Sequence, residues 1–422
     1  MAIEADAGTP ASYAAMVWET PTDFRVHTQI YTDPRIFEAE MRNIFQRSWI
    51  YAAHESEVAH PGDYVTTYAG TQPLIVSRDQ DGALHVLLNA CRHRGNSVCR
   101  EERGNSMFFR CPYHGWTYKN DGQLLGISHR TGYPADFGQD IPGLVPAGRV
   151  GAYRGLIFVN LSGEAGELEE YLGGVKQYVD YWADLSPVGT CRLLRPHKFV
   201  YPGNWKFQME NGSDGYHPRF VHESAFATMA HSRGVPMRDS SGMKEVGALH
   251  SFPHGHGVLE RPGMAALNPS VYADYMALLE ASYGPERPQR IVAGYNMLLF
   301  PNVYLMEGNI RVITPLSVDE TVVYSYPTWL DGVPDHVNKD RLRDVQWRLG
   351  TTGMIGTDDM EIFAANQSGM HAEKMEWIVL CRGIDREVAE PGGGSRCEIS
   401  DENPQRAMYR EWARLMTREP RS

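Results

Sequence analysis

Two short pairs of cysteine and histidine are the clearest chemical feature of this sequence: Cys91-Arg-His93 and Cys111-Pro-Tyr-His114. Two thiolates and two imidazoles can hold a [2Fe–2S] cluster in which histidines replace the cysteines on one of the two irons. The same four ligands could instead hold a tetrahedral zinc ion. Zinc sites usually have two cysteines followed by two histidines, whereas each pair here contains one of each. The ligand order therefore favours an electron-transferring iron–sulfur cluster.

A second candidate metal site lies in the segment from Glu210 to His222, which also contains Asp214 and His217. Two histidines and one carboxylate are the ligands of mononuclear non-haem iron sites that activate O₂. In an unbroken helix His217 and His222 would point about 140° apart and could not share a metal. Pro218 disfavours a helical conformation at His217, however, and a break there would let both imidazoles converge.

The two motifs together indicate that electrons are delivered to an iron atom at which O₂ is activated. With both motifs present, the sequence resembles the large (alpha) subunits of Rieske non-haem iron aromatic ring-hydroxylating oxygenases. In motif style it is nearest to the enzymes for benzoate, anthranilate and salicylate. The resemblance extends from about residue 37 to 367 and rests on Cys91-Arg-His93-Arg-Gly, Cys111-Pro-Tyr-His114-Gly-Trp116, Asn204-Trp205-Lys206, and Glu210-Asn211 through His222.

The resemblance implies a role for each of these side chains. The implied ligands of the Rieske [2Fe–2S] cluster are Cys91, His93, Cys111 and His114. The implied ligands of a mononuclear Fe(II) are His217, His222 and a distant aspartate. That aspartate matches Asp359, and the neighbouring Asp358 is the alternative. Asp214 matches the family's bridging aspartate, which hydrogen-bonds an iron-ligating histidine of its own chain and a cluster histidine of a neighbouring subunit.

The resemblance also implies the reaction. A terminal oxygenase of this kind uses O₂ and electrons from a reductase or ferredoxin to hydroxylate an aromatic ring, by cis-dihydroxylation or monohydroxylation. An aromatic carboxylate is the favoured substrate. A neutral polycyclic hydrocarbon is the alternative, followed by an electron carrier or a zinc-stabilised binding protein without catalysis.

Some positions match the substrate pocket of the family: Asn211, Gly212, Pro218 and Ile355. A substrate carboxylate needs a cationic or amide partner, and Arg219 or Arg311 could provide one. We interpret both arginines, however, as surface or strand-edge residues.

Composition restricts the partners and the compartment. The chain has 422 residues and a net charge of −12, which argues against nucleic acid and anionic membranes as partners. No apolar run is long enough to span a bilayer. No signal peptide is evident either. Six cysteines, with cluster ligands among them, fit a reducing cytoplasm. Respiratory Rieske proteins have two further cysteines where this chain has Asn96 and Tyr113, so no disulfide is expected beside the cluster.

The sequence predicts an α+β protein in four parts. Residues 1–45 form an N-terminal segment whose helix, from Asp33 to Phe45, packs on the catalytic domain. Residues 46–163 form an all-β Rieske domain, and residues 164–390 a catalytic domain with an antiparallel sheet covered by helices, which is helix-grip-like in the family. Residues 391–422 form a flexible linker and a C-terminal tail, in which a helix is expected from about Pro404 to Met416.

Finer expectations concern the catalytic domain and the assembly. One long helix, 339–363, interrupted by glycines at Gly353 and Gly356, carries Asp359. Residues 231–269 form a loop that covers the pocket, with exposed histidines at His250, His254 and His256. The family resemblance implies a ring of three chains, α3 or α3β3 with a small beta subunit, because the aspartate bridge crosses between subunits.

Overall fold

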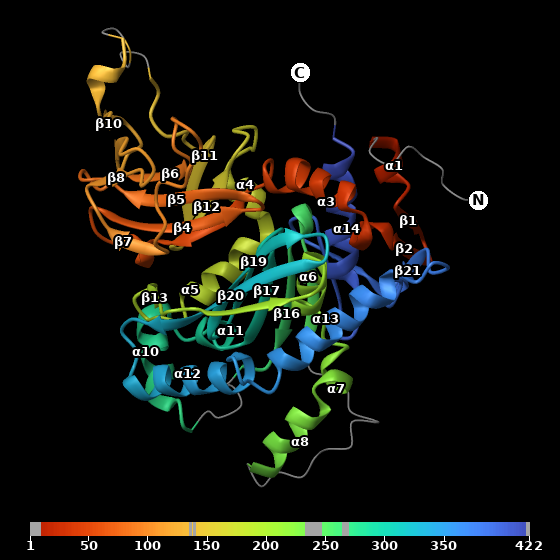
Figure 1. Ribbon diagram of the computed structural model, residues 1–422. Helices are drawn as coiled ribbons and strands as arrows, with labels where there is room; N and C mark the ends of the chain where they lie inside the picture. Colours follow the sequence, from red (N-terminus) through yellow and green to blue (C-terminus); the bar gives the residue numbers. More distant parts are fainter. Residues whose placement is uncertain (1–9, 135–136, 138–140, 233–246, 264–269, 419–422) are drawn as a thin grey trace. The chain divides into compact units, whose positions relative to one another are not determined.

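The structure is a computed structural model that describes residues 10–134, 137, 141–232, 247–263 and 270–418. The chain divides into two compact units (Figure 1). One unit comprises Phe45–Leu168, and the other comprises the chain on either side of it, including the N-terminal helices. The predicted α+β class, with one all-β unit and one unit built on a large antiparallel sheet with helices, is confirmed.

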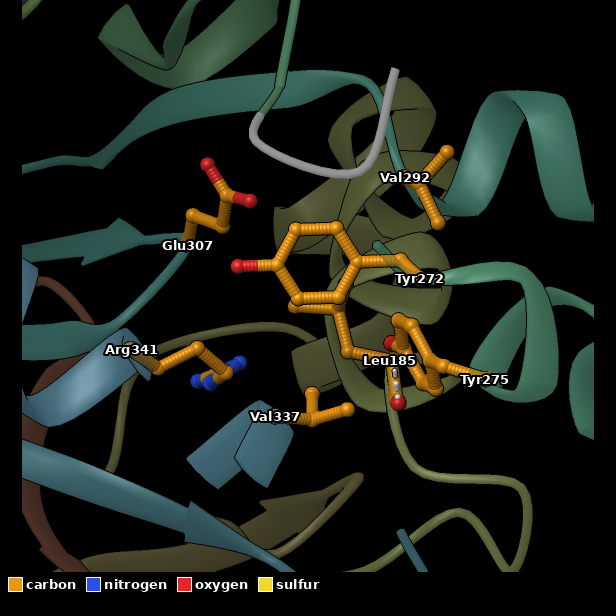
Figure 2. Close-up of a pocket in the computed structure, with 7 residues that line it drawn as sticks. All are labelled: Leu185, Tyr272, Tyr275, Val292, Glu307, Val337 and Arg341. Carbon is orange, nitrogen blue, oxygen red and sulfur yellow. Dashed lines mark hydrogen bonds between the residues drawn. The ribbon is translucent and has the colours of Figure 1, made fainter. Parts of the chain in front are cut away.

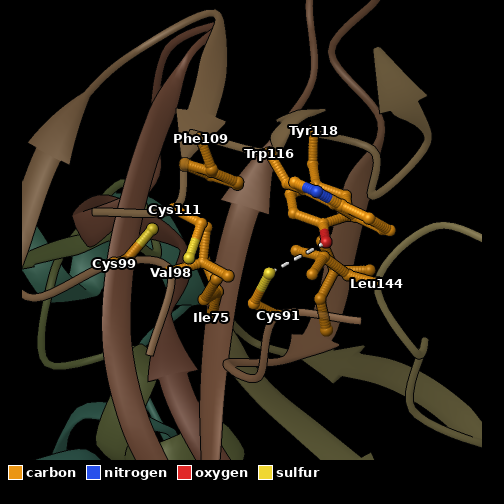
Figure 3. Close-up of a cluster of buried hydrophobic side chains, with 10 residues drawn as sticks. Ile75, Cys91, Val98, Cys99, Phe109, Cys111, Trp116, Tyr118 and Leu144 are labelled. Atoms are coloured by element: carbon orange, nitrogen blue, oxygen red, sulfur yellow. Dashed lines mark hydrogen bonds between the residues drawn. The ribbon is translucent and has the colours of Figure 1, made fainter. Parts of the chain in front are cut away.

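The Phe45–Leu168 unit consists of three small antiparallel sheets. Their strands are β3 (Ile50–His54), β4 (Asp63–Ala69), β5 (Gln72–Arg78), β6 (Leu84–Leu88), β7 (Arg103–Asn105), β8 (Phe108–Arg110), β9 (Thr117–Lys119), β10 (Leu124–Gly126), β11 (Arg149–Tyr153) and β12 (Leu156–Asn160). Both candidate cluster cysteines lie inside its apolar core, among residues such as Ile75, Phe109 and Leu144 (Figure 3). The core therefore fixes the backbone on which the cluster motif depends.

The second unit is built on a ten-stranded antiparallel sheet in the part of the chain that the structure describes. Its strand order is β13-β20-β19-β18-β17-β16-β15-β23-β22, with β14 also paired to β20. The strands are β13 (Cys191–Leu193), β14 (His197–Tyr201), β15 (Ala248–Ser251), β16 (Gly257–Arg261), β17 (Gly294–Leu299), β18 (Val303–Met306), β19 (Asn309–Ser317), β20 (Glu320–Leu330), β22 (Val388–Glu390) and β23 (Gly394–Glu398).

Helices from distant parts of the sequence pack against this sheet (Figure 1). Helix α6 (Trp205–Gly212) contacts β17 and β19, and α14 (Asn403–Met416) contacts β15 and β16. The other main helices are α5 (Lys176–Ala183), α7 (Pro218–Val221), α8 (Glu223–Ser232), α10 (Ala273–Tyr283), α12 (Asp335–Leu349) and α13 (Gly356–Met370). No helix in the described residues is both long and apolar enough to cross a membrane.

The N-terminal helix begins as predicted. Asp33 is the N-cap of α3 (Pro34–Glu40), and its side chain accepts a hydrogen bond from the backbone N–H of Arg35 at 2.8 Å. The last turn, Met41–Phe45, is a π-helix. This helix belongs to the same compact unit as the catalytic sheet.

Three expectations about the catalytic unit need correction. The helix predicted over 339–363 is interrupted near its glycines as expected, but the two parts are separate helices, α12 and α13, because the chain leaves the helical conformation between Gly350 and Ile355. A Cβ at Gly353 would lie 2.7 Å from the backbone of Arg348, so this turn closes more tightly than a side chain permits.

The flexible linker predicted from Pro391 onward is also absent. Gly392 and Gly393, with φ of 86° and 82°, form the turn of a hairpin between β22 and β23. Helix α14 follows and buries Tyr409 and Trp412. Glycines that read as a linker in the sequence are therefore the turn that places two further strands on the sheet.

The predicted cover, residues 231–269, lies partly outside the described residues. The described portion includes β15 and β16, which are interior strands of the large sheet. His250 and His256 are buried there rather than exposed. His256 accepts a hydrogen bond at Nδ1 from the backbone N–H of Phe300 at 3.1 Å, so its role is structural.

Candidate functional site

The two cysteine–histidine pairs lie on two turns of the same kind in the Rieske unit. Gly95 donates its N–H to the carbonyl of Cys91 at 2.8 Å, and Gly115 donates to Cys111 at 2.9 Å. These glycines have φ of 71° and 70°, a conformation that other residues rarely adopt. Each turn thereby presents one thiol and one imidazole from a short stretch of chain.

The four side chains of these turns converge. Cys91 and Cys111 are buried, and the rings of His93 and His114 have centroids 4.5 Å apart. His93 also stacks on Trp116 at 5.0 Å. Burial raises the pKa of the Cys111 thiol, but two backbone N–H groups and the neighbouring thiol outweigh burial and lower the pKa overall. The surroundings of Cys111 thus shift it toward the thiolate, which is the form that binds iron.

The second site begins at the end of α6. The chain leaves α6, and His217 and His222 flank the one-turn helix α7, which starts at Pro218. The expected break at His217 is wrong, because His217 has helical φ and ψ of −63° and −33° and its carbonyl accepts the N–H of Val221 at 3.0 Å. The chain instead leaves the helical conformation at His222, with φ of −106° and ψ of 21°. The two imidazole centroids are 5.3 Å apart with an interplanar angle of 81°.

Asp359 reaches the same point from the first turn of α13. Its Oδ1 lies 3.2 Å from His222 Nε2 and 3.7 Å from His217 Nε2. One ligand atom from each of the three residues lies within 4.8 Å of the others. Only 6% of the Asp359 side chain and 4% of the His222 side chain are exposed, so the three ligand atoms meet largely out of solvent.

Two further carboxylates lie on the outer nitrogens of these histidines. Asp358 Oδ2 is 3.3 Å from His222 Nδ1, and Asp214 Oδ2 is 3.5 Å from His217 Nδ1. Asp214 also accepts the backbone N–H of His217 at 3.2 Å through its other oxygen. Carboxylates in such positions orient metal-bound histidines and fix their tautomers.

Charge at this site acts on His222 in two directions. Burial alone lowers the pKa of His222, but hydrogen bonds and charge from Asp359 and Asp358 outweigh burial and raise the pKa above its usual value. A cation in place of the proton would meet the same two carboxylates. The electrostatics of the site therefore suit a metal ion.

Comparison with known proteins now identifies the family. Residues 48–135 match the Rieske [2Fe-2S] domain, and residues 183–418 match the ring hydroxylating alpha subunit (catalytic domain). The large subunit of 2-halobenzoate 1,2-dioxygenase from Burkholderia cepacia is 36% identical over 391 residues, which cover 89% of this chain and 83% of that protein. The chain belongs to the Rieske ring-hydroxylating oxygenases.

Two further similarities agree with this family. The large subunit of anthranilate 1,2-dioxygenase from Acinetobacter baylyi is 34% identical, with 88% of this chain and 83% of that protein covered. A point mutant of naphthalene 1,2-dioxygenase bound to phenanthrene superposes with a TM-score of 0.85 at 25% identity, covering 96% of this chain and 95% of that one. This Rieske oxygenase chain is an alpha subunit and an oxidoreductase, as the sequence predicted.

The side chains of this Rieske oxygenase fit the two cofactors of its family, a [2Fe–2S] Rieske cluster and a mononuclear iron. His93 Nδ1 is buried and has no hydrogen-bond partner among the described residues, so it is available to a metal. The His217, His222 and Asp359 group provides the two imidazoles and one carboxylate of a facial triad. The cofactors are confirmed, whereas the ligand assigned to each residue stays a prediction.

All six cysteines are free, in accord with the absence of a disulfide beside the cluster. Burial raises the pKa of Cys99 to about 12 and that of Cys191 to about 12, so neither is a reactive thiolate.

The positions matched to the substrate pocket all lie close to the triad. Asn211 Nδ2 lies 3.1 Å from His217 Nε2 and donates to Asp359 Oδ1 at 3.1 Å. Gly212 packs so closely that a Cβ would lie 2.2 Å from the ring of Tyr304. Pro218 follows His217 directly, and the carbonyl of Ile355 accepts the N–H of Asp359 at 3.3 Å. Contact with substrate stays a prediction for all four.

Sequence reasoning missed the buried network that positions α6. Glu40, from α3, accepts hydrogen bonds from Lys206 Nζ at 2.7 Å and Trp205 Nε1 at 2.9 Å. Trp412 of α14 donates to the same carboxylate at 2.7 Å. The Asn204-Trp205-Lys206 motif was visible in the sequence, but its acidic partner lies far away in the chain, so no local signal could reveal the pair.

Proposed function

We propose that this chain is the catalytic component of an oxygenase that hydroxylates an aromatic carboxylate. The observation that carries the proposal is the convergence of His217, His222 and Asp359 in a chain that also has a Rieske unit. Relatives named for 2-halobenzoate, anthranilate and toluate, at 36%, 34% and 35% identity, support a carboxylate on the substrate.

The proposed chemistry divides between cofactors and side chains. When bound, the cluster supplies single electrons and the mononuclear iron activates O₂. His217, His222 and Asp359 would hold that iron through two imidazoles and one carboxylate. Burial of His222 and Asp359 keeps bulk water away from the reacting ring.

Asp214 is proposed to link the two sites across a subunit boundary. It lies 3.5 Å from His217 Nδ1, and 27% of its side chain is exposed. The exposed part could accept a hydrogen bond from His114 of another copy, which would favour an α3 or α3β3 ring. The relatives are themselves named large or alpha subunits, which supports a small beta subunit as partner. We further propose that a reductase or ferredoxin donates the electrons and that the protein is cytoplasmic.

The proposed activity is tested with the purified protein, a ferredoxin and its reductase, and ¹⁸O₂. Benzoate and anthranilate are supplied in parallel with naphthalene, the neutral alternative suggested by the structural neighbour. We expect labelled ring-hydroxylated products from a carboxylate, and about three irons per chain, two from the cluster and one from the triad. Two irons per chain with no labelled product would instead indicate an electron carrier.

The subunit-crossing link is tested by mixing an Asp214→Asn chain with a His114→Ala chain. Each variant alone should be inactive. Mixed rings can pair an intact cluster with an intact neighbouring Asp214, so part of the activity should return. Mixed rings without any activity would place the path within one chain.

A further inference from the structure

Arg311 is a buried cation in an interior strand of the catalytic sheet, not a surface or strand-edge residue as predicted from the sequence. It lies in β19 and is 4% exposed. Its Nε is buried and has no hydrogen-bond partner among the described residues. No ion pair joins it to an acidic side chain in the described part of the chain. A buried guanidinium without such a partner is costly, and a ligand anion could compensate it.

The register of the sheet places Arg311 on the face that carries α6. Arg311 is the cross-strand partner of Tyr304, so their side chains lie on the same face. The Tyr304 hydroxyl donates to the carbonyl of Met209 in α6 at 2.5 Å, and its ring packs against Gly212. Gly212 adjoins Asn211, whose amide contacts two of the candidate iron ligands.

The charges around Arg311 also connect it with the iron site. Burial lowers the pKa of Arg311, and the Asp359 carboxylate opposes this effect. Arg348 adds further positive charge, although it is itself paired with Asp344. If Asp359 ligates an iron ion, the ion offsets part of the negative charge of the carboxylate. Less of that charge then stabilises the Arg311 cation.

Arg341 provides an internal comparison. It is 6% exposed, and its Nε also lacks a hydrogen-bond partner among the described residues. It donates, however, to Thr328 Oγ1 at 2.7 Å and lines a cavity of about 20 Å³, together with Tyr272 and Tyr275 (Figure 2). That volume holds roughly one water and no aromatic ring. Arg341 is therefore a buried structural arginine, whereas Arg311 is directed to the α6 face beside the triad.

We propose that Arg311 binds the carboxylate of the substrate and thereby positions the aromatic ring at the triad. The inference rests on the proposed function, because it assumes an acidic aromatic substrate. A guanidinium offers two parallel N–H donors that match a carboxylate, so the pair would fix orientation as well as charge. A neutral aromatic ring would leave the guanidinium uncompensated, which makes Arg311 a specificity-determining residue.

The test compares binding of benzoate with that of toluene, its uncharged counterpart, to the anaerobic holoprotein by calorimetry. Arg311→Gln should weaken benzoate binding by about a hundredfold, or about 2.7 kcal/mol, and leave toluene binding unchanged or tighter. Arg311→Lys should retain part of the affinity, since it keeps the charge but loses the paired donors. Arg341→Gln is the control for loss of a buried arginine, and it should not discriminate between the two ligands.

The outcomes separate this inference from the proposed function. Equal loss of benzoate and toluene in Arg311→Gln, with an intact cluster spectrum, would overturn the role of Arg311 and leave the oxygenase proposal standing. If Arg311→Gln does not fold, Arg311→Lys decides, because unchanged benzoate affinity in that variant contradicts paired binding. Wild-type protein that binds toluene but no benzoate would overturn the aromatic-carboxylate proposal itself.

Discussion

The candidate cluster ligands lie within one short stretch, Cys91 to His114, whereas the candidate iron ligands extend from His217 to Asp359. In the Rieske unit, two similar glycine turns supply all four side chains. In the catalytic unit, α7 and α13 must pack together before the third ligand meets the other two. One site therefore depends on local backbone geometry and the other on long-range packing.

This difference predicts which changes each site tolerates. The cluster site should survive damage to the catalytic sheet, because its turns lie within a separate compact unit. The iron site should respond to changes far from it in sequence, especially in the Glu40–Lys206 pair that positions α6.

The largest effect is expected from Asp359→Ala. This variant should lose the mononuclear iron and all turnover but keep the cluster absorption, because the Rieske unit does not use Asp359. Asp358→Ala is the matched control, since the Asp358 carboxylate lies on the outer nitrogen of His222, 3.3 Å from Nδ1. We expect a loss of iron affinity of about 10- to 100-fold for the control. Iron analysis and visible spectra give the measurement, and exchanged phenotypes would make Asp358 the ligand.

The second effect concerns stability. Lys206→Met leaves the Glu40 carboxylate buried without its cation and should destabilise the catalytic unit by about 3–5 kcal/mol. Lys176→Met is the control, because the Lys176–Glu169 pair is exposed and contributes at most about 1 kcal/mol. Calorimetry should show an earlier transition for the catalytic unit in Lys206→Met only. A matching shift in the loss of cluster absorption would contradict the independence of the Rieske unit.

The third effect tunes the cluster without removing it. His114→Cys should keep a bound cluster and lower its reduction potential by on the order of 100 mV, since a thiolate donates more charge to iron than an imidazole does. The iron of the triad should remain at one per chain. Electrochemistry and electron-spin spectra give the measurement. A potential equal to that of the wild type would remove His114 from the ligand set.

The same contrast explains what the sequence could predict. Cys91, His93, Cys111 and His114 could be predicted as a cluster site directly, because the candidate ligands and the turn glycines are close together in the chain. His217 and His222 could be predicted as a metal site from their residue types, although helix geometry left their convergence open. Asp359 could be predicted only through the family resemblance, because it lies far away in the sequence. Glu40 was missed because its partners are distant. The burial of Arg311 was misjudged because it depends on the order of the strands in the sheet. Gly392 and Gly393 were interpreted as a linker because turns and linkers have similar compositions.

The smallest effect concerns pH and is confined to the catalytic unit. Glu210 is buried, and its carboxylate accepts hydrogen bonds from Tyr31 at 2.7 Å and Tyr409 at 2.5 Å. Burial raises the pKa of Glu210 to about 7 against an ordinary 4.5, although the two hydroxyls and Lys206 oppose the shift. A raised pKa means that the folded state binds the proton more tightly than the unfolded state does. Its contribution to stability is therefore complete below pH 4.5 and is lost as pH rises through about 7.

Glu210→Gln should remove this dependence, because the amide oxygen still accepts the tyrosine hydroxyls but carries no charge. In the wild type, the free energy of unfolding of the catalytic unit should fall as the pH rises from acidic to neutral. The expected decrease is a few kcal/mol at most, because each pKa unit corresponds to roughly 1.4 kcal/mol. That slope should be nearly absent in Glu210→Gln. Glu398→Gln is the control, since the Glu398 side chain is 69% exposed. Urea unfolding at several pH values gives the measurement, and a slope that survives in Glu210→Gln would assign it to other groups.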